Sequence, residues 1–142
     1  TGMTKNYKIL TSYIKDISSK ISGTENYIYL KDNIPKYSLG IDINSIPLKN
    51  NMAEVNIKLN FSNKSEKDQK AYFEMTHSTV VRVDESAVNK NDLKKIFLSE
   101  VPTEMYPEIE KKFFEIVKSI GYPDIKLEKR IDFKDLFEKD QK

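Results

Sequence analysis

The chain has few of the residues on which catalytic and metal sites depend. It contains no cysteine and no tryptophan, and His77 is the single histidine among its 142 residues. Without cysteine there can be no disulfide framework and no thiolate metal site. The acidic residues do not stand at the spacing of a cation-binding loop, so we expect no metal ion. The absence of cysteine also fits a reducing compartment, and we expect a cytoplasmic protein.

The chain is also poor in glycine and in long apolar runs. Its four glycines form no phosphate-binding loop. No apolar run approaches the ~20 residues that cross a bilayer, and the N-terminus lacks the apolar segment of a signal peptide. We expect one domain over residues 1–142, in which Thr1 and Gly2 are a cloning remnant before Met3 and residues 139–142 form a flexible tail.

Neither sign of charge is in excess. The 24 basic and 22 acidic side chains leave a net charge of +2, and they are interleaved along the chain. This pattern is typical of a solvated surface, whereas nucleic-acid binding needs a basic patch. We therefore expect no nucleic-acid partner, no cofactor and no enzymatic activity. An enzyme that uses His77 with a nearby carboxylate is the alternative, although a lone histidine on the apolar face of a strand is usually a packed residue.

Apolar and polar residues alternate in four segments of the first half of the chain. Period two is the mark of a strand with one buried face, and it runs through residues 13–21, 37–44, 53–61 and 71–78. The joins between the last three segments are short, which favours antiparallel neighbours because a parallel crossover needs a dozen or more residues.

The first of these segments and its connection to the second are less regular. The alternation places Tyr13, Ile17 and Ile21 on one face, with Ile14 and Asp16 on the other. The stretch from Gly23 to Lys36 contains Pro35 and no clear period, and we expect it to be a crossover loop along the edge of the sheet.

The second half of the chain changes to a helical period. Asn91 or Asp92 can cap a short helix that runs through Phe97. We expect Pro102 to interrupt it. A longer amphipathic helix follows, with Thr103 as its N-cap, Pro107 in its first turn and Gly121 as its end, and Asp132 or Asp135 opens a last helix. Strands followed by helices predict an α+β domain, in which a four-stranded antiparallel sheet carries helices on one face.

The aromatic and aliphatic residues exceed what such a domain can bury. The chain has 8 tyrosines and 7 phenylalanines, and large apolar side chains stand in succession from Tyr27 to Leu30. Most of them are explained as core. The excess must meet a partner subunit or a ligand surface, so we expect oligomerisation.

Several short motifs resemble those of the SecB family of bacterial export chaperones, in the same order from about Tyr13 to Phe137. They are Tyr13 to Ser18 (YIKDIS), Phe73-Glu74-Met75, Glu100-Val101-Pro102 leading to Tyr106-Pro107, Gly121-Tyr122-Pro123, and Asp132-Phe133 with Leu136-Phe137. The resemblance implies an ATP-independent holdase that is a homotetramer, a dimer of dimers. It also implies that unfolded precursor chains bind in long apolar grooves and are delivered to the SecA export motor.

The resemblance also implies two sets of site residues. A client groove would be lined by the crossover region and the neighbouring helix, which makes the candidates Tyr27, Tyr29, Leu30, Tyr37, Phe97 and Met105. These residues could equally belong to the core or to a subunit interface. SecA docking in the family uses acidic residues of the exposed sheet face, where Asp16 and Glu74 match the motif positions and Tyr72 lies beside Glu74.

The chain departs from the family pattern at this docking face. The position four after Asp16, which is usually acidic, is Lys20, and the sequence pI is about 8.5, whereas typical members are acidic. The Gly-Gly pair expected shortly after Glu74 is replaced by the residues from His77 to Val81. A SecB-like chaperone dedicated to a specific client, such as an antitoxin, is therefore the alternative function.

Overall fold

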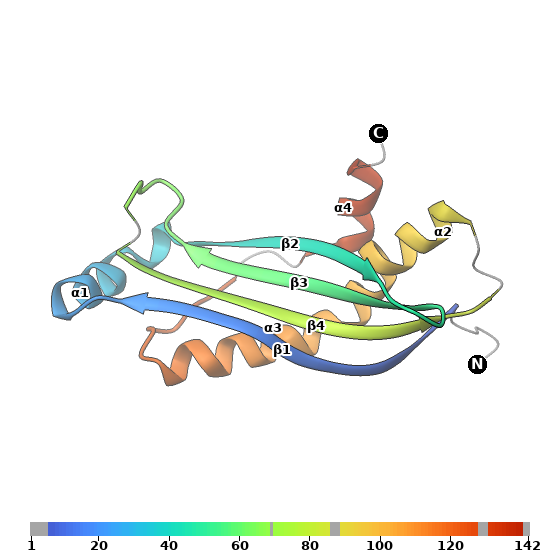
Figure 1. The fold of residues 1–142 in the computed structure, drawn as a ribbon. Helices are drawn as coiled ribbons and strands as arrows, with labels where there is room; N and C mark the ends of the chain where they lie inside the picture. Colours follow the sequence, from blue (N-terminus) through green and yellow to red (C-terminus); the bar gives the residue numbers. More distant parts are fainter. Residues whose placement is uncertain (1–5, 69, 86–88, 128–130, 141–142) are drawn as a thin grey trace.

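A four-stranded antiparallel sheet is the main element of the computed structural model, which describes residues 6–68, 70–85, 89–127 and 131–140 (Figure 1). The spatial order of the strands is β1-β4-β3-β2. Their bounds are β1 Tyr7–Ile21, β2 Ser38–Pro47, β3 Met52–Ser62 and β4 Ala71–Val83. The α+β class and the antiparallel sheet are confirmed. The predicted cloning remnant and residues 141–142 lie outside the described residues.

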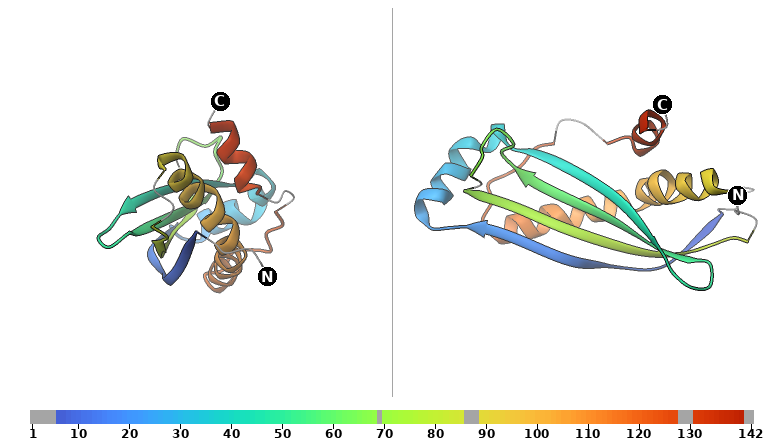
Figure 2. Two further views of the ribbon diagram at one scale, coloured as in Figure 1. Left: turned by 90° about the vertical axis from the view of Figure 1, so that its right-hand side faces the viewer. Right: turned by 45° about the horizontal axis from the view of Figure 1, so that its top comes forward.

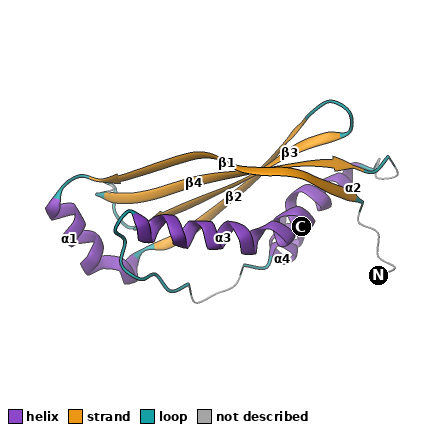
Figure 3. Ribbon diagram, turned by 90° about the horizontal axis from the view of Figure 1, so that it is seen from below, coloured by secondary structure: helices purple, strands orange, loops and turns teal. Residues whose placement is uncertain are grey.

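The helices follow the sheet in the chain, except for one that connects its first two strands. The long helix α3 runs along one face of the sheet (Figure 3), which we call the inner face, and the opposite face is the outer face. Helix α1 lies at one end of the sheet and α2 at the other (Figure 2). The bounds are α1 Thr24–Asn33, a 3-10 turn Ile34–Lys36, α2 Lys90–Lys95, a π-helical turn Ile96–Glu100, α3 Val101–Ser119 and α4 Phe133–Asp140. Residues 139 and 140, expected in a tail, are helical.

The core lies between the inner face and α3. The odd-numbered residues of β3, from Ala53 to Phe61, are at most 2% exposed, as the alternation of the sequence predicts. The ring of Phe113 on α3 packs edge-on against Phe61 at 5.9 Å and against Phe73 of β4 at 5.6 Å. Each such buried side chain stabilises the fold by about 1.5–3 kcal/mol relative to an exposed one.

The prediction for the faces of β1 was wrong because the strand is bulged. Its register against β4 shifts between Ile9 and Thr11 and again between Ile14 and Asp16. The extra residue at the second bulge reverses the alternation. Ile14 and Ile17 therefore both lie on the inner face, opposite His77 and Met75, whereas Tyr13 lies on the outer face.

The connection between β1 and β2 was also predicted wrongly, since helix α1 replaces most of the expected loop. The two strands stand at opposite edges of the sheet, so the chain does cross over, as expected. Glu25 in the first turn and Lys31 in the last suit the helix dipole, and Pro35 follows the end. Leu30 anchors the helix, because its side chain is fully buried in the core.

The helical region after β4 is continuous from Lys90 to Ser119, so the expected interruption at Pro102 does not occur. The cap is Asn89, whose side-chain oxygen accepts from the Asn91 backbone N–H at 2.8 Å. The wider π-helical turn lies just before Pro102, where the proline removes a backbone donor. Thr103 is therefore not an N-cap, and Pro107 lies inside α3.

The ends of the last two helices agree with the sequence. Gly121 has a φ of +104°, and Tyr122 N–H donates to the Val117 carbonyl at 2.9 Å, which closes α3. Of the two aspartates proposed to open α4, Asp132 is the cap: its carboxylate accepts from the Asp135 backbone N–H at 3.0 Å.

Candidate functional site

An apolar cleft opens beside the start of β2, between that strand and the segment after α3. Its volume is about 670 Å³. We call it the β2 groove, and its lining consists of Ile34, Pro35, Tyr37, Ser38, Leu39, Phe61, Asp124, Ile125, Lys126, Leu127 and Ile131. One wall is the 3-10 turn with β2, and the other is the extended segment 124–127. Most of these side chains are aliphatic or aromatic, so the groove can hold apolar side chains without a defined sequence.

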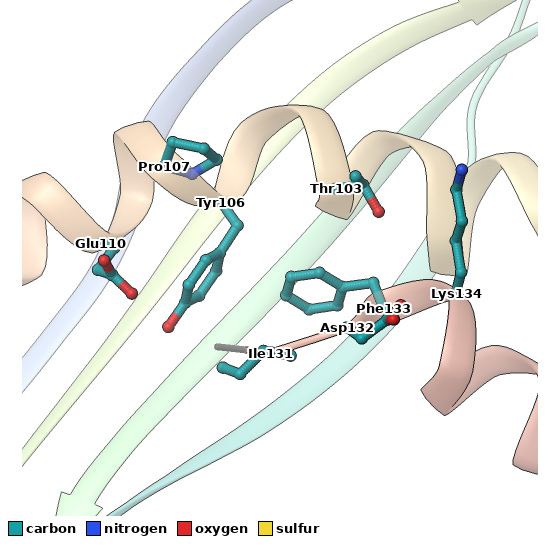
Figure 4. A pocket seen from close by; sticks show the side chains of 8 residues that line it. All are labelled: Thr103, Tyr106, Pro107, Glu110, Ile131, Asp132, Phe133 and Lys134. Carbon is teal, nitrogen blue, oxygen red and sulfur yellow. The ribbon is translucent and has the colours of Figure 1, made fainter. Parts of the chain in front are cut away.

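A second cleft adjoins the β2 groove. It has a volume of about 520 Å³ and lies between α3 and the start of α4 (Figure 4). The rings of Tyr106 and Phe133 pack edge-on at 5.2 Å, with Ile131 beside them. Because Ile131 lines both clefts, the apolar surface extends from β2 to α3.

Among the candidates for client binding, Tyr37 is the one that lines the β2 groove. Its ring packs against Phe61 at 5.3 Å, and its hydroxyl donates to the Ala71 carbonyl at 2.8 Å. Burial raises the pKa of Tyr37 to about 12, so the hydroxyl stays neutral and only positions the ring. Sequence alternation placed Leu39 on the same face as Tyr37 and could have identified it as a neighbour.

The three candidates on α1 point in different directions. Tyr27 is 39% exposed, whereas Leu30 is fully buried and offers no surface to a ligand. Tyr29 is half-buried: its hydroxyl accepts from the Asn63 side-chain amide at 2.9 Å, and the Lys70 ammonium lies 4.9 Å from its ring centre. On a helix these nearby residues point to different sides, whereas the sequence had suggested one continuous apolar stretch.

Phe97 and Met105 lie away from the β2 groove. Phe97 lines a cleft of about 560 Å³ at the other end of the sheet, with Leu48, Val83 and Leu93. Met105 is 6% exposed and belongs to the core. The structure therefore does not bring the six candidates together. The groove residues that sequence reasoning missed, Ile125, Leu127 and Ile131, carried only a weak signal in an irregular segment.

The outer face of the sheet carries a polar network centred on Glu54. The Glu54 carboxylate accepts hydrogen bonds from Lys15 at 3.0 Å, from Ser78 at 2.9 Å and from the Tyr13 hydroxyl at 3.0 Å. The hydrogen bonds from Lys15 and Ser78 lower the pKa of Glu54 to about 2. Because these donors come from β1 and β4, the network joins three strands.

The three candidates for SecA docking all lie on this outer face. Asp16 pairs with Thr76, Tyr72 pairs with Lys20, and Glu74 follows two residues after Tyr72. The Glu74 carboxylate is 3.1 Å from the Lys58 ammonium and accepts from Asn60 at 2.9 Å. The acidic residues are thus interleaved with lysines. Their role in docking stays a prediction.

His77 is a packed residue of the core. It is fully buried under α3, and its one polar contact within the described residues is the Lys112 ammonium, 3.1 Å from Nε2. Burial and the Lys112 charge lower the pKa of His77 to about 4, so the ring is neutral. Within the described ranges no group of His, Asp and Glu could hold a metal ion, and no helix is long and apolar enough to cross a membrane.

Comparisons with known proteins agree with one another. The family model described as "Preprotein translocase subunit SecB" matches residues 2–142. A SecB relative from Pelagibacter ubique is 47% identical over 135 residues, which cover 95% of this chain and 96% of that protein. The protein-export protein SecB of Mesorhizobium japonicum is 26% identical over 140 residues, which cover 97% of this chain and 81% of that protein.

A solved structure has a similar fold. It is the Mycobacterium tuberculosis SecB-like chaperone in complex with a ChAD peptide from the HigA1 antitoxin. The TM-score is 0.65 with 11% identity, covering 89% of this chain and 91% of that chain. At this identity the likeness concerns the fold, whereas the match of the family model over the whole chain decides the family. The chain therefore belongs to the SecB family of protein-export chaperones.

Proposed function

We propose that the protein is an ATP-independent holdase of the cytoplasm, which binds unfolded precursor polypeptides in the β2 groove and delivers them to SecA. The observation that carries the proposal is the groove itself, an open apolar cleft of about 670 Å³ on a protomer whose only histidine is buried and neutral. A holdase needs no catalytic group. It needs apolar surface that binds the unfolded state of a client and not its folded state.

Assembly as a tetramer is part of the proposal. Several large apolar side chains are between 37% and 51% exposed on the protomer, among them Leu10, Ile17 and Ile28. Contacts between subunits are one way to cover exposed apolar side chains of this kind. A dimer of dimers would cover part of them and bring several β2 grooves together, so that one long client could occupy more than one groove.

The second candidate function is that of a chaperone dedicated to one specific client, such as an antitoxin. The outer face supports it, because Lys58 neutralises Glu74 and Lys20 stands opposite Tyr72, so the surface offers little net negative charge to a SecA-like partner. The similar M. tuberculosis chaperone was solved with an antitoxin peptide. A client of that kind would occupy the same groove, and only the partner to which it is delivered would differ.

Light scattering on a sizing column tests the holdase. The protein is run alone and with a reduced and alkylated polypeptide that stays unfolded in buffer, without ATP. We expect a tetramer that retains the unfolded chain and ignores the same chain in its folded form. Retention of neither form would contradict the proposal.

A pair of variants locates the binding surface. Leu39→Ser removes an apolar side chain from the β2 groove, whereas Leu136→Ser removes an exposed one from α4. We expect the first to weaken client binding by roughly tenfold and the second to leave it within about twofold, since losing a buried apolar contact costs about 1–3 kcal/mol. Equal effects would show that clients bind elsewhere. Adding SecA to the same assay separates export from a dedicated role.

A further inference from the structure

The outer face of the sheet has two halves that differ in charge. The half next to α1 is balanced, since its acidic residues Asp16, Asp42 and Glu74 stand among Lys20, Lys58 and Lys64. The other half lies at the end of the sheet where the β2–β3 turn stands (Figure 1), and we call it the hairpin half. Its charged and apolar side chains include Lys8, Tyr13, Lys15, Ile46, Leu48, Lys49, Met52, Glu54, Val80 and Arg82.

The hairpin half is basic because its carboxylate is already engaged. Glu54 accepts from Lys15 at 3.0 Å and from Ser78 at 2.9 Å. In contrast, Lys8, Lys49 and Arg82 are exposed and form no ion pair within the described part of the chain. The next carboxylates, at positions 84 and 85, follow the end of β4 and line the cleft that contains Phe97.

Two of these cations face each other directly. Lys8 of β1 is the cross-strand partner of Arg82 in β4, and Arg82 pairs on its other side with Met52 of β3. The Arg82 guanidinium is 3.9 Å from the Met52 sulfur. Like charges directly opposite each other destabilise a sheet. An anion supplied by a partner would turn this repulsion into a favourable contact.

Exposed apolar side chains accompany the cations. Ile46 is 43% exposed and Leu48 and Tyr13 are each 44% exposed. Leu48 is fixed in the turn, because its N–H donates to the Met52 carbonyl at 2.8 Å. A nucleic acid would satisfy the cations and leave these aliphatic groups in water. The interface of an anionic bilayer suits both, since it offers phosphates to lysine and arginine and an apolar boundary to aliphatic and tyrosine side chains.

We propose that the hairpin half of the outer face binds reversibly to a bilayer surface that contains anionic phospholipids. Lys8, Lys49 and Arg82 contact the lipid phosphates, and Ile46 and Leu48 enter the boundary between headgroups and acyl chains. The β2 groove lies on the inner side of the sheet and stays accessible. The proposal does not depend on the holdase function, but the contact would hold a loaded chaperone at the membrane where export takes place.

The expected binding is weak and depends on salt. Each lysine or arginine close to an anionic surface raises the affinity roughly fivefold, so three cations give on the order of a hundredfold over a neutral surface. The attraction reaches about 10 Å at 0.1 M salt and less at higher salt. Binding of unfolded clients through apolar contacts should survive the same increase in salt, which separates the two activities.

Co-sedimentation of the full chain with lipid vesicles tests the proposal. One set of vesicles contains equal parts of phosphatidylglycerol and phosphatidylcholine, and the other contains phosphatidylcholine alone. We expect binding to the anionic vesicles that weakens as salt is added, and little binding to the neutral ones. Equal binding to both sets, or no binding to the anionic vesicles at low salt, overturns the proposal.

Two pairs of variants locate the surface. Lys49→Gln removes a cation of the hairpin half, and Lys20→Gln removes an exposed lysine from the half next to α1. Ile46→Ser and Ile28→Ser each remove an exposed isoleucine, the first from β2 and the second from α1. We expect Lys49→Gln and Ile46→Ser to weaken vesicle binding roughly threefold or more, while the two controls leave it unchanged.

Other results for these variants would contradict the assignment. If Ile46→Ser binds like the unchanged protein, the cations attract a polyanion of another class, such as a nucleic acid, and the lipid surface is overturned. Equal weakening by all four substitutions would show that adhesion has no defined surface. If Ile46→Ser changes the oligomeric state in light scattering, a second copy of the chain covers the hairpin half.

Lys8→Gln gives a readout that a purely structural role would not. Removing one member of the like-charged pair should weaken vesicle binding and raise the urea midpoint slightly, because the repulsion with Arg82 is gone. Loss of both binding and stability would show that Lys8 acts in the fold, which overturns its role in lipid binding.

The outcomes also separate this proposal from the holdase. Lys49→Gln and Ile46→Ser should retain an unfolded polypeptide on the sizing column as well as the unchanged protein does. Client retention without vesicle binding leaves the holdase intact and overturns the lipid surface alone. Loss of client retention in both variants would place the two activities on one surface and would also overturn the proposal.

Discussion

The inner and outer faces of the sheet are built from the same strands but are stabilised differently. On the inner face, residues such as Phe61 and Phe73 are at most 1% exposed and pack against Phe113. On the outer face, Glu54 collects hydrogen bonds from β1 and β4. Burial of apolar surface thus stabilises one face, and a carboxylate network links the strands on the other. The difference confines the apolar groove to the inner side and leaves the outer face available to polar partners.

The largest effect is expected from the centre of the inner face. Phe113→Ala removes a fully buried ring that contacts both Phe61 and Phe73, and it should lower the free energy of unfolding by about 3–5 kcal/mol. Urea denaturation at a fixed protein concentration measures this change.

The neighbouring residue provides the control. Phe114 is half-buried and follows Phe113 on α3, so Phe114→Ala should cost clearly less. Equal losses for the two variants would mean that subunit contacts, and not the inner face of the protomer, determine stability.

The centre of the outer face should give a smaller effect. Glu54→Ala leaves Ser78, which is fully buried, without its acceptor and should cost about 1–3 kcal/mol in urea denaturation. Glu74→Ala is the matched control, since this carboxylate is more exposed and accepts fewer bonds, and its loss should be smaller. If both variants are neutral, the network does not stabilise the sheet.

The inner face should respond to moderately low pH through His77. The pKa of His77 is about 4 in the folded protein and near its ordinary 6.5 when unfolded, because burial disfavours the charged ring. Between these values the unfolded chain binds the extra proton. Stability is therefore full above about pH 6.5 and falls as the pH drops toward 4, by on the order of 3 kcal/mol.

Comparison with His77→Gln separates the contribution of His77 to the free energy of unfolding from the contributions of the other titrating groups. Denaturation of both proteins across that pH range should show a steeper loss for the wild type. Parallel curves would argue against a buried neutral histidine. The contribution of Glu54 falls in a more acidic range. Its pKa is about 2 in the folded protein and 4.5 ordinarily, so the stabilisation by Glu54 is lost only as the pH falls below about 4.5.

The smallest effect is expected at the rim of the outer network. Tyr13→Phe deletes one of the hydrogen bonds to Glu54 and keeps the ring, so it should lower stability by about 0.5–1 kcal/mol. Combined with Glu54→Ala, the second substitution should add nearly nothing, because the shared acceptor is gone. Fully additive losses would place Tyr13 outside the network.

Short-range patterns predicted much of this fold. The alternation from Ala53 to Phe61, the glycine at position 121 and the opening of the last helix at one of two aspartates, which proves to be Asp132, depend on residues close together in the chain, and all three are confirmed. The wrong predictions have tertiary causes. A bulge at Lys15 reversed the faces of β1, and the need to bury Leu30 favoured a helix in the crossover.

The candidate site was less accessible to sequence reasoning than the fold. Tyr37 could be placed in it, but Ile125 and Leu127 come from an irregular segment that joins the groove only after α3 has packed across the sheet. No local period marks such a wall, since its position depends on contacts between distant parts of the chain.

The sequence by itself determined the α+β class, the buried faces of β2, β3 and β4 and the membership of the SecB family, because these follow from periodicity and from motifs read in order along the chain. Only the tertiary structure decided that Glu54 joins three strands, that Leu30 is buried and that an apolar groove opens beside β2. These features depend on strand order and packing, which bring together residues that are far apart in the chain and carry no shared local signal.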